Sequence, residues 1–356
     1  MYTLSPEQKR VLTDIGNCRT AVLGGHLDVC IDCGYERPAY NSCRNRHCPK
    51  CQALAQEKWI GAQRERMLDV RYFHVVFTLP AELRPLAAFA PRVVYDALFQ
   101  AAARTLLEFG ERRLSAKLGA TLILHTWTRD LRFHPHVHAI VTGGGLALDA
   151  SRWCTGHRRF LFPVKAMGRV LRGKMSQTLR EAYRKGEFAR FDDFLDPEGF
   201  DRLLARIATK NWNVYAKPSF DKGDHVLKYL GRYTHRVGLA NSRLLDVTSS
   251  SITFRTKGEA TATLSPVQFL RRFVQHVLPT GYHKIRHVGL HASDSLRDRA
   301  RLLSGTQLVV SPPLSWRERL EKLTGRDLAT CPRCSGLLAP IAIPTPQSRA
   351  PPVLVA

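Results

Sequence analysis

The stretch FHPHVHAIVTGGG, from Phe133 to Gly145, places histidines at alternate positions 134, 136 and 138 ahead of three glycines. Alternate side chains of a β-strand share one face, so His136 and His138 are expected to point the same way as Ile140. The intervening residues are apolar, which indicates a central strand buried on both faces and closed by the glycines. Two imidazoles buried there are costly unless they pair with polar groups or bind a metal. The stretch therefore predicts either a metal site or a polar cluster on a central strand.

The remaining pattern mixes strands and helices without regular βαβ alternation, which favours an α+β fold with an antiparallel sheet. Aromatic and β-branched runs predict strands, and Pro or Ser starts with Gly stops predict helices. The expected strands are 72–79, 121–127, 136–142 and 211–216, with a hairpin over 251–264, and the expected helices are 53–69, 91–110, 163–186, 224–236 and 265–278. We expect an N-terminal module with a basic helix at 1–70, a larger domain at 71–305 that contains the histidine strand, and a tail at 306–356 that ends in a disordered Pro-rich segment.

The charge of the chain predicts an anionic partner. Lys and Arg number 54 against 30 Asp and Glu, which gives a net charge of +24 and a pI near 10.1. Nucleic acid is the favoured partner, because its phosphates are closely spaced along the strand. No apolar run approaches the ~20 residues of a spanning helix, and the first residues lack a signal-peptide core. We therefore expect no membrane partner, a cytoplasmic location and reduced cysteines.

Two CxxC pairs, Cys30 with Cys33 and Cys48 with Cys51, predict one structural Zn²⁺ in a tetrahedral thiolate site. Four nearby residues could replace one of these ligands or build a second site: Cys43, His47, Cys18 and His26. The basic residues of the same loop suit contact with DNA phosphates, although a solvated charged loop is an equal alternative; these are Arg44, Arg46 and Lys50. A further pair, Cys331 and Cys334, has no matching partner pair in the sequence, so either another group completes it or it stays free.

Tyr229 and Tyr233 lie four residues apart in a predicted helix and so share one face. Packing in the core is the ordinary role of such a pair. However, basic residues crowd this helix: Lys228, Arg232 and Arg236. A phenol can attack a phosphodiester when a divalent cation, here Mg²⁺ or Mn²⁺, polarises the phosphate. His136 and His138 are candidates to hold that cation.

Together with SCRNRHCPKCQ, YFHVVFTLP, HPHVHAIVTGGGL and YLGRYTHR, these features resemble the two-tyrosine HUH transposases of rolling-circle insertion sequences, the IS91 type. The resemblance covers roughly residues 15 to 290. It implies a palm-like antiparallel sheet with flanking helices after a small zinc-ribbon-like module. It also implies His136 and His138 as metal ligands, with Tyr229 and Tyr233 as nucleophiles that form 5′-phosphotyrosine links to single-stranded DNA. The implied host is prokaryotic, with the protein at the nucleoid.

The third ligand of the catalytic metal is left open by the sequence. His225 is the first choice because it would share the tyrosine face, and Asp130, His125 and His134 are alternatives. The chain has no GxxxxGK[ST] motif, so we expect a host helicase to unwind the DNA. Two further functions stay open, namely a plasmid-type rolling-circle replication initiator and a non-catalytic zinc-ribbon DNA-binding regulator. The sequence does not indicate an oligomeric state.

Overall fold

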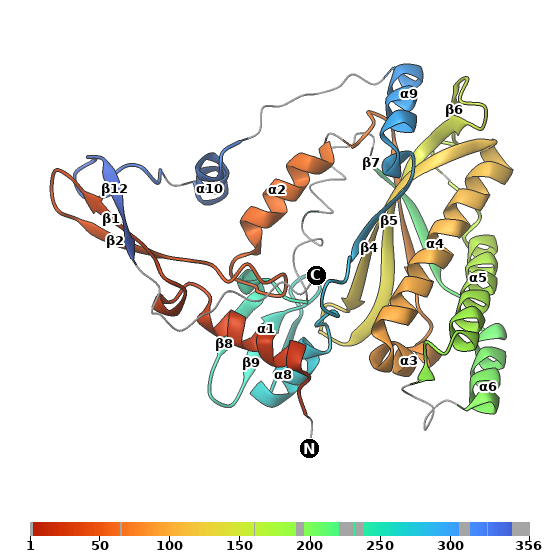
Figure 1. The fold of residues 1–356 in the computed structure, drawn as a ribbon, viewed down its shortest axis with the longest axis horizontal. Coiled ribbons are helices and arrows are strands. Elements are labelled where there is room, and N and C mark those ends of the chain that lie inside the picture. The colour runs from red at the N-terminus through yellow and green to blue at the C-terminus, as the bar shows by residue number, and fades with distance from the viewer. Residues whose placement is uncertain are drawn as a thin grey trace.

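The computed structural model describes residues 3–64, 66–159, 161–189, 196–220, 231, 238–305, 314–325 and 327–343. A six-stranded antiparallel sheet with helices on one side forms the larger part of the molecule, and a smaller part reaches away from it (Figure 1). The α+β prediction with an antiparallel sheet is confirmed. Within the described residues, no helix combines the length and apolar content needed to cross a bilayer.

The large sheet has the strand order β11-β4-β5-β3-β7, with the short β6 paired to β5. Its strands are β3 (Tyr72–Thr78), β4 (Ala116–Trp127), β5 (Phe133–Ala147), β6 (Trp153–Thr155), β7 (Val214–Phe220) and β11 (Ile285–Gly289). The strand with the alternating histidines, β5, lies between β4 and β3, as its apolar pattern predicts. The main apolar core lies on the face that contains Val137, Ala139 and Val141, whereas Ile140 packs on the opposite face.

Helices cover the core face of the sheet. They are α3 (Arg84–Phe89), α4 (Pro91–Leu114), α5 (Val164–Arg184) and α6 (Pro197–Ala208), preceded by the 3-10 turn η2 (Ala81–Leu83). One apolar stripe of α5 is buried in this core, with Met167, Leu171, Met175 and Leu179. The predicted end of α4 at Gly110 is wrong. The helix continues to Leu114 and ends where Ser115 takes the left-handed conformation.

The three glycines at 143–145 do not end β5, as the sequence suggested, but lie inside it. A Cβ on Gly144 would lie 2.5 Å from the carbonyl oxygen of Cys154, and one on Gly145 would lie 2.5 Å from that of Lys117. The glycines therefore allow close approach of neighbouring backbones rather than a turn. Pro135 likewise lies within the strand, where its carbonyl accepts from the amide of Leu79.

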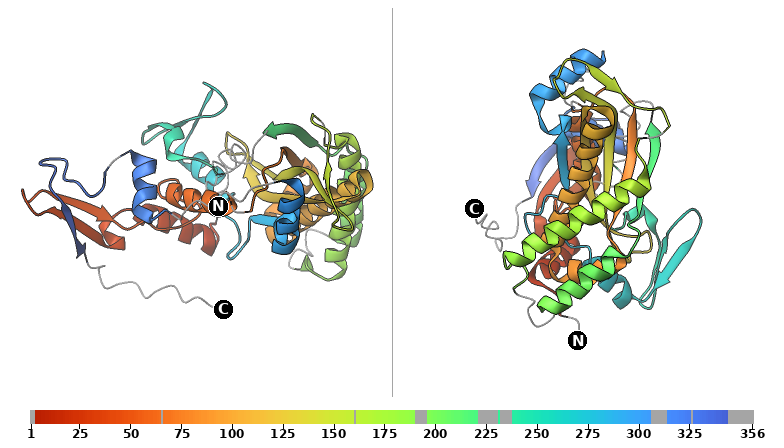
Figure 2. Two further views of the ribbon diagram at one scale, coloured as in Figure 1. Left: turned by 90° about the horizontal axis from the view of Figure 1, so that it is seen from above. Right: turned by 90° about the vertical axis from the view of Figure 1, so that its right-hand side faces the viewer.

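The smaller part combines both ends of the chain. Its three-stranded sheet has the order β12-β1-β2, so residues expected to form a disordered tail supply a strand. Figure 2 shows this sheet at one end of an elongated molecule and the large sheet at the other. The elements here are α1 (Pro6–Asn17), the 3-10 turn η1 (Ala21–Leu23), β1 (Gly25–Cys30), β2 (Glu36–Tyr40), α2 (Gln52–Arg64), α10 (Trp316–Thr324) and β12 (Leu338–Ile343).

A second small sheet has the strand order β10-β9-β8. It contains the predicted hairpin, and Ser265 caps the following helix as expected. Val11 of α1 packs against Phe273 and Val274 of that helix, which joins the N-terminal module to the rest of the chain. The remaining elements are η4 (Asn241–Arg243), β8 (Leu244–Val247), β9 (Ile252–Arg255), β10 (Thr261–Leu264), α8 (Pro266–Val274), η5 (Leu290–Ala292) and α9 (Asp294–Ser304).

Candidate active site and cysteine clusters

Three histidines converge on the two central strands of the large sheet. His125 of β4 lies directly opposite His136 of β5 in the antiparallel register, and His138 follows two residues later on the same face. One ring nitrogen from each of the three lies within 4.8 Å of those of the other two. The Nε2 atoms of His136 and His138 are 3.0 Å apart. The histidine pair predicted from β5 is thus joined by a third imidazole from β4.

Neighbouring groups fix the orientation of two of these rings. The Nδ1 of His136 lies 2.7 Å from the backbone carbonyl oxygen of His134, so this nitrogen carries the proton and donates it to the carbonyl. The Nε2 of the same ring is therefore an unprotonated lone pair that points into the cluster. The Nδ1 of His138 lies 2.7 Å from Nε2 of His74 on β3, with the two rings stacked.

Burial keeps these imidazoles neutral. Loss of solvation lowers the pKa of His136 to about 4 and places the pKa of His138 well below its ordinary value. The same cause lowers the pKa of His74 to about 4. Neutral imidazole is the form that ligates a metal, so the cluster is ready to bind a cation at neutral pH.

The geometry of the cluster fits a divalent cation. Adjacent ligands at about 2.1 Å from an octahedral ion lie about 3 Å apart, which is close to the 3.0 Å between the two Nε2 atoms. His125, His136 and His138 would hold such an ion through one imidazole nitrogen each, and the ion would supply Lewis-acid chemistry there.

Of the other candidates for the third ligand, the two that the structure describes, Asp130 and His134, do not join this cluster. His225 lies outside the described residues. Asp130 is engaged with Arg132, whose Nε is 2.7 Å from its carboxylate, and with the hydroxyl of Thr128. The ring of His134 contacts Arg84 through Nδ1 at 2.9 Å. Among the described residues, the geometry therefore favours His125 as the third ligand. His225, the first choice from the sequence, stays a prediction.

His74 is a site residue that sequence reasoning missed, although it stands out as a histidine in the apolar run YFHVVFTL. Partners of this kind orient metal-ligating histidines, and losing one typically weakens metal affinity 10–100-fold. We expect His74→Phe, which keeps a packed ring, to raise the metal concentration for half-maximal DNA cleavage by about 10–100-fold. The rate at saturating metal should stay near that of the unmodified protein.

A metal titration of cleavage by His74→Phe, with the exposed His283→Phe as control, measures this effect. An unchanged titration curve would show that His74 does not orient His138. A loss of rate that no metal concentration restores would instead give His74 a different role.

Both predicted nucleophiles, Tyr229 and Tyr233, lie outside the described residues, as do Lys228, Arg232 and Arg236. Gly231, between the tyrosines, is described and buried. A Cβ on Gly231 would lie 2.4 Å from Cδ1 of Ile60, so α2 packs directly against this point of the chain. The neighbouring Trp59 of α2 packs against the apolar cluster of Tyr72, Ile123 and Ile140 on the histidine face of the sheet.

The nine cysteines form two clusters of four, with Cys154 apart. Cluster A comprises Cys18, Cys43, Cys48 and Cys51, and cluster B comprises Cys30, Cys33, Cys331 and Cys334. The predicted site of Cys30, Cys33, Cys48 and Cys51 is therefore wrong, because its two pairs lie in different clusters. Cys18 and Cys43, which the sequence offered as replacement ligands, belong to cluster A.

The hairpin formed by β1 and β2 explains why the two CxxC pairs lie in different clusters. Cys30 and Cys33 lie at the far end of β1, whereas Cys18 precedes this strand and Cys43 follows β2. Six residues of extended strand span about 20 Å, which keeps the two ends of the hairpin apart. The two histidines considered as zinc ligands, His26 and His47, contact different groups. His26 is 3.3 Å from Asp28, and Nε2 of His47 accepts from the amide of Leu278.

Cluster A lies at the start of α2, since Cys51 immediately precedes Gln52. The amide of Cys43 donates to Sγ of Cys18, and Sγ of Cys43 is 3.8 Å from that of Cys51. Four thiolates at about 2.3 Å from a tetrahedral Zn²⁺ have sulfur atoms about 3.8 Å apart. The cluster therefore fits zinc, and the positive end of the helix dipole favours thiolates at this point.

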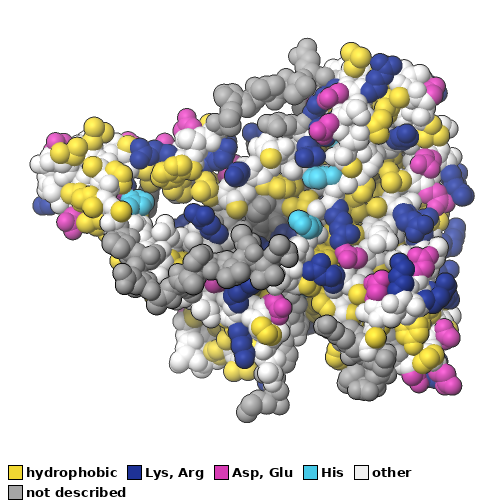
Figure 3. All heavy atoms as spheres, in the orientation of Figure 1, with side chains coloured by type: hydrophobic (Ala, Val, Ile, Leu, Met, Phe, Trp, Pro, Cys, Tyr) yellow, Lys and Arg dark blue, Asp and Glu magenta, His cyan; other side chains and the backbone are white. Residues whose placement is uncertain are grey.

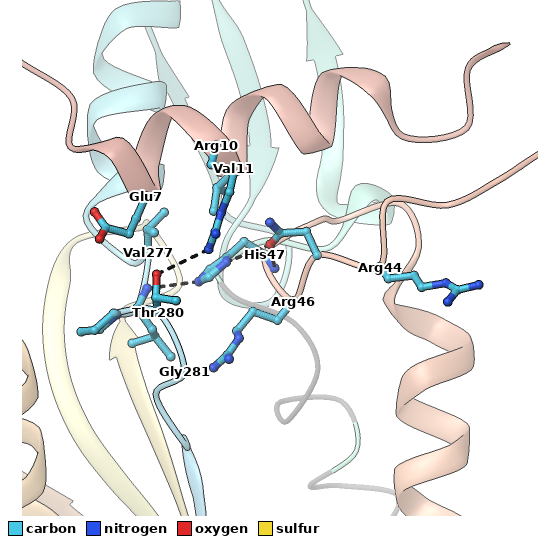
Figure 4. Close-up of a pocket in the computed structure, with 12 residues that line it drawn as sticks. Glu7, Arg10, Val11, Arg44, Arg46, His47, Val277, Thr280 and Gly281 are labelled. Carbon is cyan, nitrogen blue, oxygen red and sulfur yellow. Dashed lines mark hydrogen bonds between the residues drawn. The ribbon is translucent and has the colours of Figure 1, made fainter. Parts of the chain in front are cut away.

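The predicted DNA-binding residues of this loop divide into two groups. Arg44 and Lys50 are exposed, whereas Arg46 is half-buried and donates to the backbone carbonyl of Tyr282. A pocket of about 220 Å³ lies between α1, this loop and the 277–281 turn. Arg10 and His47 point toward the turn, while Arg44 points away from the pocket (Figure 4). Lys and Arg side chains recur over much of the face drawn in Figure 3.

Comparisons with known proteins agree with this arrangement. Residues 119–299 match the family described as "Putative transposase" (Y2_Tnp), and residues 1–79 match the transposase zinc-binding domain Zn_Tnp_IS91. The "Putative transposase y4qJ" of Sinorhizobium fredii is 39% identical over 350 residues, which cover 93% of this chain and 88% of the relative. The transposase for insertion sequence element IS801 of Pseudomonas savastanoi pv. phaseolicola is 31% identical, over 78% of this chain and 68% of its own length.

Among solved structures, a metal-bound conjugative relaxase TrwC in complex with oriT DNA matches with a TM-score of 0.26 and 14% identity. That match covers 46% of this chain and 70% of the relaxase. The two relatives match most of the length of this chain. The two family matches cover its N-terminal module and most of the large sheet. The chain therefore belongs to the IS91-type transposases and includes their N-terminal zinc-binding domain.

Proposed function

We propose that this transposase nicks and rejoins single-stranded DNA in rolling-circle transposition, through 5′-phosphotyrosine links to Tyr229 and Tyr233. The observation that supports this most directly is the cluster of His125, His136 and His138 on the two central strands. The proposal is tested by incubating the protein with single-stranded DNA from candidate element ends and Mg²⁺ or Mn²⁺. A covalent protein–DNA adduct should then survive denaturation on a gel, and no adduct with any end would favour a DNA-binding regulator instead.

The chemistry that a divalent cation supplies at the histidines is polarisation of the scissile phosphate, which offsets the charge that develops there. A tyrosine oxygen attacks the phosphorus, and the bond from phosphorus to the 3′-oxygen breaks. In net terms the phenolic proton moves to the leaving oxygen, which gives a free 3′-hydroxyl and a 5′-phosphotyrosine. The phosphodiester energy is kept in the new link, so a 3′-hydroxyl can reverse the step and join the strands.

Two tyrosines allow two successive attacks without release of the DNA. One should nick first, and the other should accept the second strand end. We favour Tyr229 for the first attack. Gly231, between the two tyrosines in the sequence, packs against Ile60 of α2, the helix whose Trp59 packs against the apolar cluster on the histidine face.

We also assign a structural Zn²⁺ to cluster A. All four of its cysteines fall within residues 1–79, which match the zinc-binding domain. The zinc would fix the start of α2, and thereby the helix that packs on Gly231 and on the histidine face. Unwinding of the DNA is left to a host helicase, since the sequence has no P-loop motif.

The net charge of +24 predicts strongly salt-dependent binding of single-stranded DNA. If about six phosphates are neutralised, log K should fall with log salt at a slope of about −4, at roughly −0.7 per contact. Replacing the exposed pair Arg44 and Lys50 by alanine should reduce the steepness of this slope by about 1.4 if both contact phosphates. Binding isotherms at several salt concentrations measure this.

A second variant that also loses two positive charges tests whether the change in slope is specific to the loop of Arg44 and Lys50. Arg184 and Lys185 are exposed at the end of α5, in the helical layer on the other side of the sheet. Their replacement by alanine should leave the slope unchanged. A slope near zero for the unmodified protein, or equal effects of both double variants, would mean that this loop does not contact the DNA.

A further inference from the structure

Cluster B unites two CxxC pairs that lie at opposite ends of the sequence. Sγ of Cys30 is 3.4 Å from that of Cys334, and Sγ of Cys33 is 3.7 Å from that of Cys331. All four sulfur atoms lie within 4.8 Å of one another. These separations exceed the about 2.05 Å of a disulfide bond and are near the about 3.8 Å expected around a tetrahedral Zn²⁺. The sulfur atoms are therefore placed for one shared ion.

The two pairs have the same backbone geometry. The amide of Gly34 donates to the carbonyl of Cys30 at 3.1 Å, and that of Ser335 donates to the carbonyl of Cys331 at 2.9 Å. Gly34 has φ +66° and Ser335 has φ +65°, so each pair is followed by a left-handed residue. This conformation is unfavourable for serine and persists only where the surroundings impose it. The repeated turn indicates two equivalent thiolate loops that face one another.

Backbone amides also turn toward the sulfur atoms. The amide of Arg333 donates to Sγ of Cys331 at 3.4 Å. Such hydrogen bonds stabilise the thiolate over the thiol, and the thiolate is the form that binds metal. The arrangement around Cys331 therefore suits a ligand rather than a buried neutral thiol.

The strands β1 and β12 also join the N-terminal and C-terminal segments that carry the two CxxC pairs. β12 pairs with β1 along its whole length, from Gly25 opposite Ile343 to Cys30 opposite Leu338. The guanidinium of Arg37 bonds to the carboxylate of Asp28 and to the carbonyl of Leu328. The apolar core of this unit is small and includes two of the cysteines themselves. A unit with so little apolar burial typically needs a metal or disulfides to hold together.

We propose that cluster B binds a second structural Zn²⁺ and joins the segments 25–40 and 327–343 into one zinc ribbon. An all-thiolate tetrahedral site selects zinc or iron among the common metals, and an isolated structural site of this kind is ordinarily a zinc site. The zinc-binding module is then completed by residues near position 330, far outside the 1–79 match. The helix α10 precedes the segment 327–343 in the chain and packs beside α2.

Elemental analysis of the full chain, purified under reducing conditions without chelators, should find two zinc ions per chain. The double variant Cys331→Ser/Cys334→Ser should contain one, and so should Cys43→Ser/Cys51→Ser, which disrupts cluster A. Cys154→Ser is the matched control, because this cysteine lies outside both clusters, and it should retain two. A single zinc in the unmodified chain that Cys331→Ser/Cys334→Ser also retains would overturn the proposal, and iron at cluster B would overturn the assignment of zinc.

A second measurement guards against variants that lose metal by unfolding. Protein loaded with Co²⁺ should show sulfur-to-cobalt charge-transfer absorption, and Cys331→Ser/Cys334→Ser should lose about half of it while the large sheet stays folded by circular dichroism. Mapping of the unmodified chain by mass spectrometry should find all four cysteines of cluster B reduced. A disulfide between Cys30 and Cys334, formed in protein kept under reducing conditions, would contradict a metal site.

Discussion

The double variant Tyr229→Phe/Tyr233→Phe should form no covalent adduct with single-stranded DNA under conditions where the unmodified transposase does. Phenylalanine keeps the aromatic ring and removes only the hydroxyl, so the nucleophile is lost with little change in packing. DNA binding should stay within about twofold, because the phosphate contacts come from basic side chains. Of the single variants, Tyr229→Phe should remove the first adduct, whereas Tyr233→Phe should keep that adduct and block complete strand transfer.

Tyr215→Phe is the matched control for these variants. Tyr215 lies on the edge strand β7 of the same sheet and is 57% exposed, so its hydroxyl is accessible without being part of the proposed chemistry. This variant should form the adduct at the normal rate. If the double variant still forms an adduct while the protein is folded, the nucleophile is another residue and the proposed mechanism is wrong.

His138→Ala should lower the rate of DNA cleavage by about 10³ or more at any metal concentration. A bound cation supplies several kcal/mol of transition-state stabilisation, and each 1.36 kcal/mol changes the rate about tenfold. His138 should be the most sensitive of the three histidines, since its ring is close to both His136 and His125 and is oriented by His74. Single-turnover cleavage with Mg²⁺ and with Mn²⁺ measures the loss.

His125→Ala should give a loss of similar size, which would distinguish it from the other proposed third ligands. Asp130→Ala should have little effect on metal dependence, because the carboxylate pairs with Arg132. His157→Ala is the control for a lost imidazole, since His157 is exposed in the loop before α5. Normal cleavage by His138→Ala would show that the histidine cluster is a polar packing feature.

The position and burial of β5 could be predicted because they depend on a local period of two. Apolar residues on both faces of that strand indicated a central position, which the structure confirms. The length of the strand could not be predicted in the same way. Whether Gly143, Gly144 and Gly145 turn the chain or let other backbones approach depends on residues such as Lys117 and Cys154, which the sequence does not place beside them.

The candidate active site also combines features that the local sequence predicts with features that depend on distant residues. The pairing of His136 with His138 follows from spacing within one strand. The approach of His125 depends on the register between β4 and β5, and that of His74 depends on the position of β3. Neither register is encoded in a short motif. The cysteines illustrate this further, because the spacing of Cys30, Cys33, Cys48 and Cys51 suggested one site, whereas the length of the hairpin separates them.

Cys30 and Cys334 lie in one cluster although 304 positions separate them in the sequence. This separation determines when the sheet of β12, β1 and β2 can form during synthesis. At roughly 5–20 residues per second, a ribosome needs about 15–60 s to make the intervening chain. During that time β1 has an open edge, which is a template for unwanted strand pairing. Closing so long a loop costs roughly 5 kcal/mol of entropy, less than the about 10–16 kcal/mol that a structural zinc supplies at neutral pH. The edge of β1 that β12 covers in the finished protein therefore stays unpaired until the last cysteines emerge.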